Sequence, residues 1–326
     1  MISGIIESNR VNLPQICLKE QGNIDLESKI QQKDRWLDNP NVNTDTFYLP
    51  FVQGFLSVVA KQPLIFIMDV SALGKGFIVL MISVVYKNRS IPIVWKVLEG
   101  EKGHLPQREH ICLMMRLHDI LQQTKNEIVI LGDGEFDGTC LQRLWQMWGW
   151  KYAVRTAKDT KLYQTNQTVK AEELKIGQIP LNTWLEAYKQ SDGNVVNAYL
   201  WHEPKYDEPI ALLTNLESGY SAKAFYRKRF LIETFFSDQK SRGFFVHKTR
   251  LKKTYRIDKL LICTCLAYIW LVCLGDFIKK NNKKYKKIAR KDRNDISLFQ
   301  IGLRWLKSGY FRINHLLKAI QFSVRF

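Results

Sequence analysis

Three acidic residues, Asp69, Asp133 and Glu233, have the setting that metal-assisted phosphoryl transfer requires. Asp69 follows the apolar run LIFIM, and Asp133 follows the apolar run EIVIL after one glycine, so each is expected at the end of a buried strand. A carboxylate there is costly unless it is solvated or bound to a cation. Taken singly, either aspartate is more simply a solvated strand-end acid or a turn cap, and Glu135 and Asp137 compete with Asp133.

Glu233 lies in the basic stretch SAKAFYRKRFLIETFFSDQKSR at residues 221–242. If this stretch is one continuous helix, four polar residues share a sector of about 60° beside an apolar stripe. They are Tyr226, Arg229, Glu233 and Lys240. Thr234 and Asp238 fall on the side expected to be solvated. An exposed helix with a simple Arg229–Glu233 ion pair is the plainer interpretation. The alternative is a metal-binding acid beside cations that hold phosphates.

The elements that would position these residues follow a recognisable order. Predicted strands and helices alternate as three antiparallel strands, a helix, a strand, a helix and a strand. The strands are Leu64–Met68, Phe77–Tyr86, Ile91–Leu98, Glu127–Leu131 and Lys151–Arg155, and the helices are 106–123 and Thr139–Trp148. This order predicts an α/β fold with a ribonuclease-H-like catalytic core, interrupted by a mostly β insertion and flanked by helical N- and C-terminal regions.

The predicted division of the chain has five parts. They are a helical N-terminal region at 1–60, the first part of the core at 61–155, a mostly β insertion at 156–219, the second part of the core with the catalytic helix at 220–275, and a basic C-terminal helical region at 276–326.

The net charge of +18 favours a polyanion as partner, either nucleic acid or an anionic membrane. The charge is uneven: residues 1–60 hold 5 Lys/Arg against 7 Asp/Glu, whereas 221–258 hold 11 against 3 and 276–326 hold 14 against 3. The basic connector 243–256 is expected to contact DNA through Lys248 and Arg250.

Three further features bear on the compartment. The N-terminus shows no basic region followed by an apolar one, so no signal peptide is expected. The longest apolar run, Leu260–Leu274, is shorter than a spanning helix and is interpreted as a buried core helix rather than a membrane segment. The 6 cysteines show no C-x-x-C spacing, which favours free thiols in a reducing cytoplasm and argues against zinc.

The spacing Tyr226-x2-Arg229-x3-Glu233-x6-Lys240 resembles the Tyr–Arg–Glu–Lys signature of DDE transposases of the insertion-sequence-4 family. Asp69 in IFIMDVS and Asp133 in VILGDGEF resemble the regions of that family's first and second acids. The likeness covers roughly residues 40–275, although many relatives carry Arg where this chain has Gly134.

The resemblance implies a metal-dependent enzyme that cuts and joins DNA at the ends of an insertion sequence. Asp69, Asp133 and Glu233 would hold two Mg²⁺ ions, for which Mn²⁺ can substitute, while Tyr226, Arg229 and Lys240 would grip phosphates near the scissile bond. The implied partners are double-stranded DNA, as transposon ends and as target, and a second copy in a homodimer on DNA, with no membrane. The implied location is the cytoplasm, on the nucleoid.

Two alternatives stay open at this stage. A ribonuclease-H-like nuclease would use the same metals without strand transfer. A catalytically dead relic of a transposase would only bind DNA, although the intact acid triad argues against it.

Overall fold

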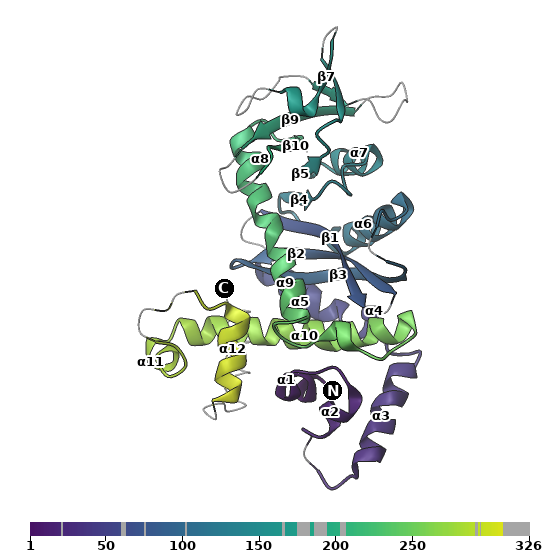
Figure 1. Ribbon diagram of the computed structural model, residues 1–326, viewed down its shortest axis with the longest axis vertical. Coiled ribbons are helices and arrows are strands. Elements are labelled where there is room, and N and C mark those ends of the chain that lie inside the picture. The colour runs from purple at the N-terminus through teal and green to yellow at the C-terminus, as the bar shows by residue number, and fades with distance from the viewer. Residues whose placement is uncertain are drawn as a thin grey trace.

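A computed structural model describes the chain over residues 1–20, 22–59, 63–74, 76–101, 103–164, 167–174, 183–185, 194–202, 207–290, 293 and 295–308. Its centre is a sheet of ten strands in the order β3-β2-β1-β4-β5-β10-β9-β8-β6-β7 (Figure 1). The strands are β1 (Leu64–Gly74), β2 (Phe77–Tyr86), β3 (Arg89–Glu99), β4 (Ile128–Gly132), β5 (Lys151–Thr156), β6 (Lys161–Gln164), β7 (Gln167–Lys170), β8 (Thr183–Leu185), β9 (Asn194–Trp201) and β10 (Ile210–Thr214).

The first five strands form the part of the sheet that the sequence predicted. β1, β2 and β3 make an antiparallel meander, because the links between them are too short for a parallel crossover. β4 and β5 each follow a helix and run parallel to β1 and to each other. The carboxyl ends of β1, β4 and β5 therefore lie toward one edge of the fold. Strands β1 and β4 are apolar over their paired length, as strands covered on both faces must be.

The strands of the 156–219 segment continue this sheet. β10 pairs antiparallel with β5, from Ala211 opposite Thr156 to Thr214 opposite Ala153. β9 pairs with β10, and β8, β6 and β7 extend the sheet further, toward the top of Figure 1. The segment between β5 and the following helix is thus attached to the core through backbone hydrogen bonds.

Helices cover both faces of the sheet. One face carries α6 (Gln107–Leu121) and α7 (Thr139–Met147). Helix α6 contacts β2 and β3, and helix α7 contacts β5 and β9. The other face carries α8 (Gly219–Tyr226), the 3₁₀ turn η2 (Arg227–Phe230) and α9 (Leu231–Gln239). α8 contacts β4 and β5, and α9 contacts β1 and β3, so this run crosses the carboxyl ends of the strands that carry the predicted acids (Figure 1).

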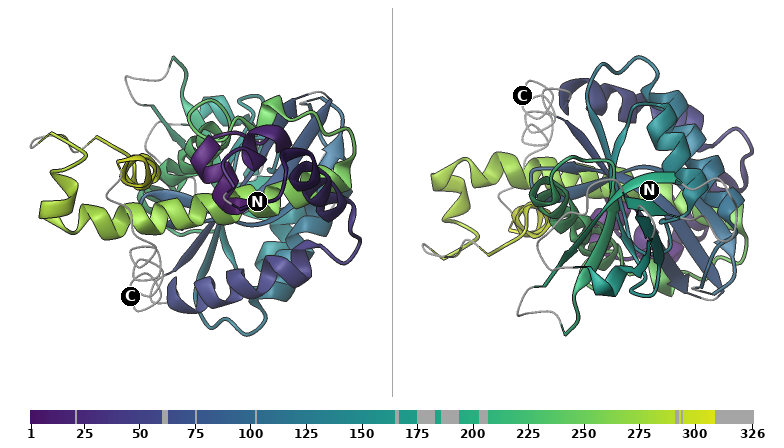
Figure 2. Two further views of the ribbon diagram at one scale, coloured as in Figure 1. Left: turned by 90° about the horizontal axis from the view of Figure 1, so that it is seen from below. Right: turned by 90° about the horizontal axis from the view of Figure 1, so that it is seen from above.

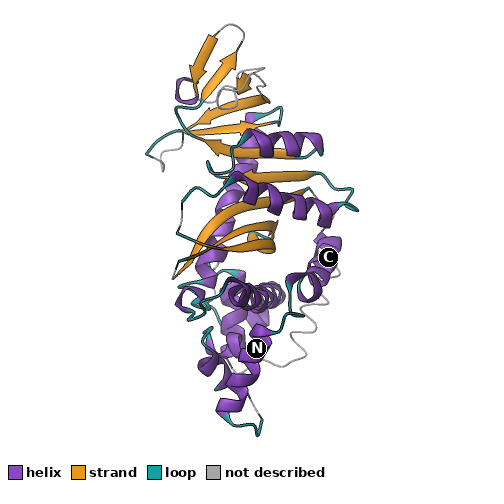
Figure 3. Cartoon of the chain, turned by 90° about the vertical axis from the view of Figure 1, so that its right-hand side faces the viewer, coloured by secondary structure: helices purple, strands orange, loops and turns teal. Residues whose placement is uncertain are grey.

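The remaining helices gather around one long helix, α10 (Thr254–Lys279), which Figure 3 shows nearly end-on below the sheet. Around it lie α1 (Ile2–Ser8), α2 (Leu13–Cys17), α3 (Leu26–Asp38), α4 (Thr44–Phe47), α5 (Leu49–Val59), the turn η3 (Val246–Lys248), α11 (Asn282–Tyr285) and α12 (Leu298–Lys307). Helix α1 lies across α10 in the view from below (Figure 2). Within the described residues α10 is long and apolar enough to cross a membrane, but 83% of its most apolar window is buried in the fold, as in a core helix.

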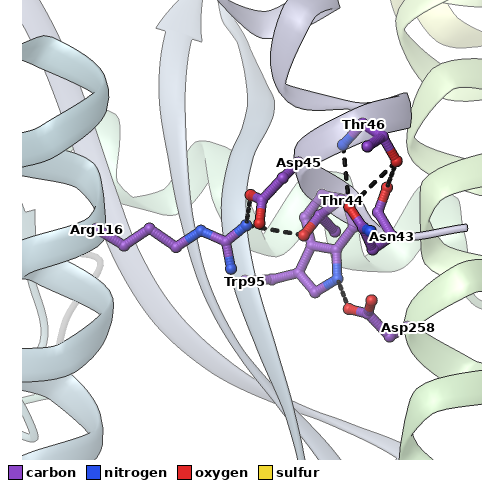
Figure 4. Close-up of polar contacts among 7 residues, drawn as sticks. All are labelled: Asn43, Thr44, Asp45, Thr46, Trp95, Arg116 and Asp258. Atoms are coloured by element: carbon purple, nitrogen blue, oxygen red, sulfur yellow. Dashed lines mark hydrogen bonds and ion pairs between the residues drawn. The ribbon is translucent and has the colours of Figure 1, made fainter. Parts of the chain in front are cut away.

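Polar contacts attach the N-terminal helices and α10 to the sheet. The Arg116 guanidinium of α6 contacts Asp45 and donates to the Thr44 hydroxyl at 2.8 Å (Figure 4). The Trp95 indole of β3 donates to the Asp258 carboxylate at the start of α10, at 2.7 Å. Burial raises the pKa of Asp258, although this hydrogen bond opposes the shift. These contacts join the start of α10 and helix α4 to the sheet and to α6.

Three expectations from the sequence need correction. Strand β1 continues past Asp69 to Gly74, because the hairpin to β2 extends the pairing, so Asp69 lies within the strand instead of at its end. The 221–242 stretch is not one helix, since η2 separates α8 from α9 and Lys240 lies just beyond α9. Asp238 is buried, not solvated, because Arg89 of β3 reaches it with an ion pair at 3.4 Å.

The buried Asp238 makes stability depend on pH. Burial raises its pKa to about 6, despite the nearby charges of Arg89 and Arg242. A raised pKa in the folded state means that the contribution to stability is complete below about pH 4 and is lost as the pH rises through about 6. We expect Asp238→Asn to gain roughly 2–3 kcal/mol relative to the parent between about pH 4 and pH 7. Denaturant unfolding across this range measures the gain, and parallel pH profiles for the two proteins would contradict it.

Candidate active site

The register of the sheet places Asp69 and Asp133 at the same level of neighbouring strands. Ile67 of β1 pairs with Leu131 of β4, and each aspartate lies two residues further along the chain, Asp69 within β1 and Asp133 just after the end of β4. Adjacent strands are about 4.8 Å apart, so the two aspartates start from adjacent backbone positions. The Asp69 side chain is buried, and its carboxylate accepts a hydrogen bond from the Val70 amide at 2.8 Å.

The two acids that compete with Asp133 are engaged elsewhere. Glu135 lies 3.3 Å from the imidazole of His110 and accepts from the Leu105 amide at 3.1 Å. Burial raises its pKa, but these two contacts outweigh burial and the net shift is downward. Asp137 accepts from the Thr156 hydroxyl at 2.6 Å, and its pKa is raised by burial and by the charge of Asp133. Glu135 and Asp137 therefore each have partners of their own, whereas Asp133 is the acid that lies at the level of Asp69.

The run α8–η2–α9 brings Tyr226, Arg229 and Glu233 to this place. Tyr226 ends α8 and is buried against the Trp201 ring of β9, with ring centroids 5.8 Å apart. The Arg229 guanidinium donates to the Glu233 carboxylate at 2.6 Å and lies 5.8 Å from the centre of the Tyr226 ring. The break in the helix therefore leaves the Arg229–Glu233 pair intact.

Electrostatic coupling joins these residues to both aspartates. Burial lowers the pKa of Arg229, but Tyr226, Glu233 and Asp69 together raise it above its ordinary value. Burial raises the pKa of Tyr226 to about 12, and the nearby charges include Arg229 and Asp133. The phenol is therefore protonated at neutral pH and can donate a hydrogen bond to a phosphate. Arg229 lies within the electrostatic reach of two of the three predicted acids, and Tyr226 within that of the third.

In the described part of the chain, no three His, Cys, Asp or Glu side chains are grouped closely enough to hold a metal ion. The Glu233 carboxylate forms an ion pair with the Arg229 guanidinium and is not grouped with the two aspartates. The donor chemistry nevertheless suits Mg²⁺, which prefers carboxylate oxygens. A divalent ion would compete with Arg229 for Glu233.

The other predicted DNA-contacting residues lie further along the same edge. The Lys240 amine donates to the Ser71 hydroxyl of β1 at 2.8 Å, two residues beyond Asp69. Lys248 closes the turn η3, which contacts β1, and Arg250 follows it; both side chains are exposed. Lys240 is thus beside the first acid, whereas Lys248 and Arg250 lie beyond the end of β1.

One cation outside the predicted set, Arg155, also lies close to Asp133. Arg155 is exposed on β5, one residue past the registered pair Gly132–Val154, so it lies at the level of Asp133. It lines a cavity of about 850 Å³ together with Asp133 and His104, and its charge acts on Tyr226. The signal was present in the sequence, because carboxyl ends of parallel strands meet at one edge of a sheet.

We expect Lys240→Ala to weaken binding to duplex DNA and to make binding less dependent on salt. Each lost phosphate contact lowers the slope of log affinity against log salt by about 0.9. Fluorescence anisotropy over a salt series measures the slope, with the exposed Lys125→Ala as the control for loss of one positive charge. A slope equal to that of the control would remove Lys240 from the phosphate-contacting set.

The fold and site define a protein with carboxylates, cations and a basic surface suited to nucleic-acid phosphates. A family model described as the transposase DDE domain matches residues 74–270, well over half of the chain, and the chain therefore belongs to this family of transposases. DDE transposases generally use divalent metal ions.

A search of curated proteins found no match. Among solved structures, a Marinitoga piezophila Argonaute in complex with 5′ OH guide RNA and target DNA is 10% identical, with 61% of this chain and 29% of that chain covered at a TM-score of 0.24. The Aquifex aeolicus Argonaute is 12% identical, with 62% and 28% covered at a TM-score of 0.27. The chain spans less than a third of these proteins, and TM-scores this low establish no common fold.

Proposed function

We propose that this protein is a DDE transposase of the insertion-sequence-4 type that cuts and joins DNA at the ends of its own element. The proposal rests on one observation above all: the α8–η2–α9 run carries Tyr226, which is electrostatically close to Asp133, and the Arg229–Glu233 pair, whose guanidinium is electrostatically close to Asp69. The order of β1 to β5, with their two helices, supports a ribonuclease-H-like core for this site.

In this proposal Asp69, Asp133 and Glu233 are the catalytic acids and the ligands of two Mg²⁺ ions. Bound divalent ions would supply Lewis-acid stabilisation of the attacking and leaving oxygens of an in-line displacement. Manganese can substitute for magnesium. The buried position of Asp69 excludes water around one of these ligands, and this strengthens the electrostatic interactions that it makes.

The cations and the tyrosine position the DNA. Tyr226 donates through its protonated phenol, while Arg229 and Lys240 contact the phosphates that flank the scissile bond. If Glu233 bound a divalent ion, the Arg229 guanidinium would be available to donate to a phosphate oxygen instead. Lys248 and Arg250 extend this contact along the backbone of the duplex.

The proposal includes the partners and the organisation of the chain. The partners are double-stranded DNA, as transposon ends and as target, and a second copy in a homodimer on DNA. The proposed units are 1–60, the core at 61–155 and 220–275, the insertion at 156–219 and the basic region at 276–326. A protein with this function acts on the nucleoid in the cytoplasm.

The test is an incubation of linear DNA that carries the sequences flanking this gene with the protein and Mg²⁺ or Mn²⁺. We expect cuts at two matching inverted ends, and strand-transfer products when a pre-cut end and a target plasmid are supplied. Cuts without transfer would favour a ribonuclease-H-like nuclease. Salt-sensitive binding without any cut would favour a DNA-binding relic.

A further inference from the structure

A groove of about 1040 Å³ lies beside the turn η3, and Lys248 of this turn is among its lining residues. Its walls come from segments far apart in the sequence: residues 10–15 around the start of α2, part of α3, the connector 248–253 and the start of α10. Six cationic residues line it, against one acid, Asp34. They are Arg10, Lys248, Arg250, Lys252, Lys253 and Arg256.

The single acid is already neutralised. Asp34 forms an ion pair with Arg256, whose guanidinium also lies 3.6 Å from Asp38. Among the described residues the other five cations form no ion pair with a carboxylate. Two of them lie near the same aromatic ring: the Arg10 guanidinium is 4.1 Å and the Lys248 amine 5.2 Å from the centre of the Phe245 ring. Gathering like charges in this way costs free energy that an anionic ligand would recover.

The turn η3 connects the groove to the strand that carries Asp69. Strand β1 runs from Asp69 past Ser71, which accepts from Lys240, to Gly74. At Gly74 a side-chain Cβ would lie 2.5 Å from the His247 carbonyl oxygen, so the backbone of η3 is packed directly against the end of β1. Lys248 follows immediately and opens the groove. A line of cations therefore leads from the acids to the groove along β1 and η3.

We propose that this groove binds the phosphate backbone of duplex DNA adjacent to the cleavage site. The inference rests on the proposed function for its location, and on the charge of the groove for its ligand. It assigns DNA contact to Arg10, Lys252 and Lys253 in addition to Lys248 and Arg250, and it gives the N-terminal residues 10–15 a part in binding although residues 1–60 are net negative. The positive charge of the groove comes from Arg10, from the connector 248–253 and from Arg256.

The test compares two triple variants of the full chain in the presence of EDTA, so that cleavage plays no part. The groove variant is Arg10→Gln, Arg250→Gln and Lys252→Gln, and the matched control is Lys19→Gln, Lys125→Gln and Lys161→Gln, which removes three exposed positive charges elsewhere. The probe is a fluorescein-labelled duplex of about 30 base pairs. We expect the groove variant to bind at least about tenfold more weakly at moderate salt, with a salt slope lower by about 2 to 3. The control should change the slope by less than about 1.

Unchanged affinity and slope in the groove variant would overturn the groove assignment, and the cleavage test would still decide the proposed function. Equal losses in both triple variants would also overturn it, because the effect would come from net charge alone. Weaker binding of poly-glutamate with unchanged binding of DNA would reassign the groove to an acidic protein. Thermal unfolding of each variant verifies that a loss of binding is not a loss of fold. Hydroxyl-radical footprints should lose protection beside the cleavage site in the groove variant only.

Discussion

Glu233→Gln abolishes metal-dependent DNA cleavage and leaves duplex binding within about threefold of the parent protein; this is the largest effect that we expect on activity. Glutamine keeps the size of the side chain and an oxygen that can accept from Arg229, which the Glu233 carboxylate now contacts at 2.6 Å. It removes the negative charge that a divalent cation needs. The rate should fall by at least about a thousandfold, equivalent to roughly 4 kcal/mol of transition-state stabilisation.

The matched control is Glu217→Gln, an exposed glutamate shortly before α8. It should cut DNA at the rate of the parent protein. Cleavage by Glu233→Gln within tenfold of the parent would remove Glu233 from the catalytic set. Loss of DNA binding in parallel with cleavage would instead assign Glu233 a structural role in positioning Arg229.

Gly275→Ala destabilises the fold by about 3 kcal/mol or more, the largest effect that we expect on stability. Helices α10 and α12 contact each other through two glycines. A Cβ at Gly275 would lie 1.8 Å from the Leu298 carbonyl oxygen, and a Cβ at Gly302 would lie 2.1 Å from the Leu271 carbonyl oxygen. Because both obstacles are backbone atoms, no side chain can move to make space, and α12 must shift away from the apolar face of α10.

Gly54→Ala is the control, since it makes the same change within helix α5 with nothing within 4 Å of the added carbon. It should stabilise the protein by about 0.5–1 kcal/mol, because alanine favours helix more than glycine does. Denaturant unfolding of the three proteins measures both effects. A Gly275→Ala protein as stable as the parent would mean that α12 does not pack closely on α10.

The sequence predicted the core because its strands are apolar and short links separate them. The runs LIFIM, EIVIL and KYAVR all lie in strands of the sheet, and the short links of the meander are compatible only with antiparallel pairing. The expected fold predicted that Asp69 and Asp133 lie side by side, and the pairing of β1 with β4 agrees with this prediction. Local pattern was sufficient here because most residues of these strands are buried.

What the sequence did not reveal depends on residues far apart along the chain. The helical wheel assigned Asp238 to solvent, since a wheel contains no information about Arg89, which lies about 150 residues earlier and reaches it from β3. Arg155 was not predicted as a site residue, because its position near Asp133 and Tyr226 depends on the pairing of β5 with β4 and on the packing of α8. The groove beside η3 joins residues 10–15 to residues 248–260, and no local pattern connects them.

The order of the sheet also has a consequence for the newly made chain. The proposed acids are separated by the whole insertion: Asp133 follows β4, whereas Glu233 follows β10, which must first pair with β5. At synthesis rates of about 5–20 residues per second, the hundred residues between them take about 5–20 s to appear. A ribosome-bound chain with its first strands folded would carry two acids without the third. Under the proposed function, a truncated product that ends before α9 would lack one of the three acids and would not cut DNA.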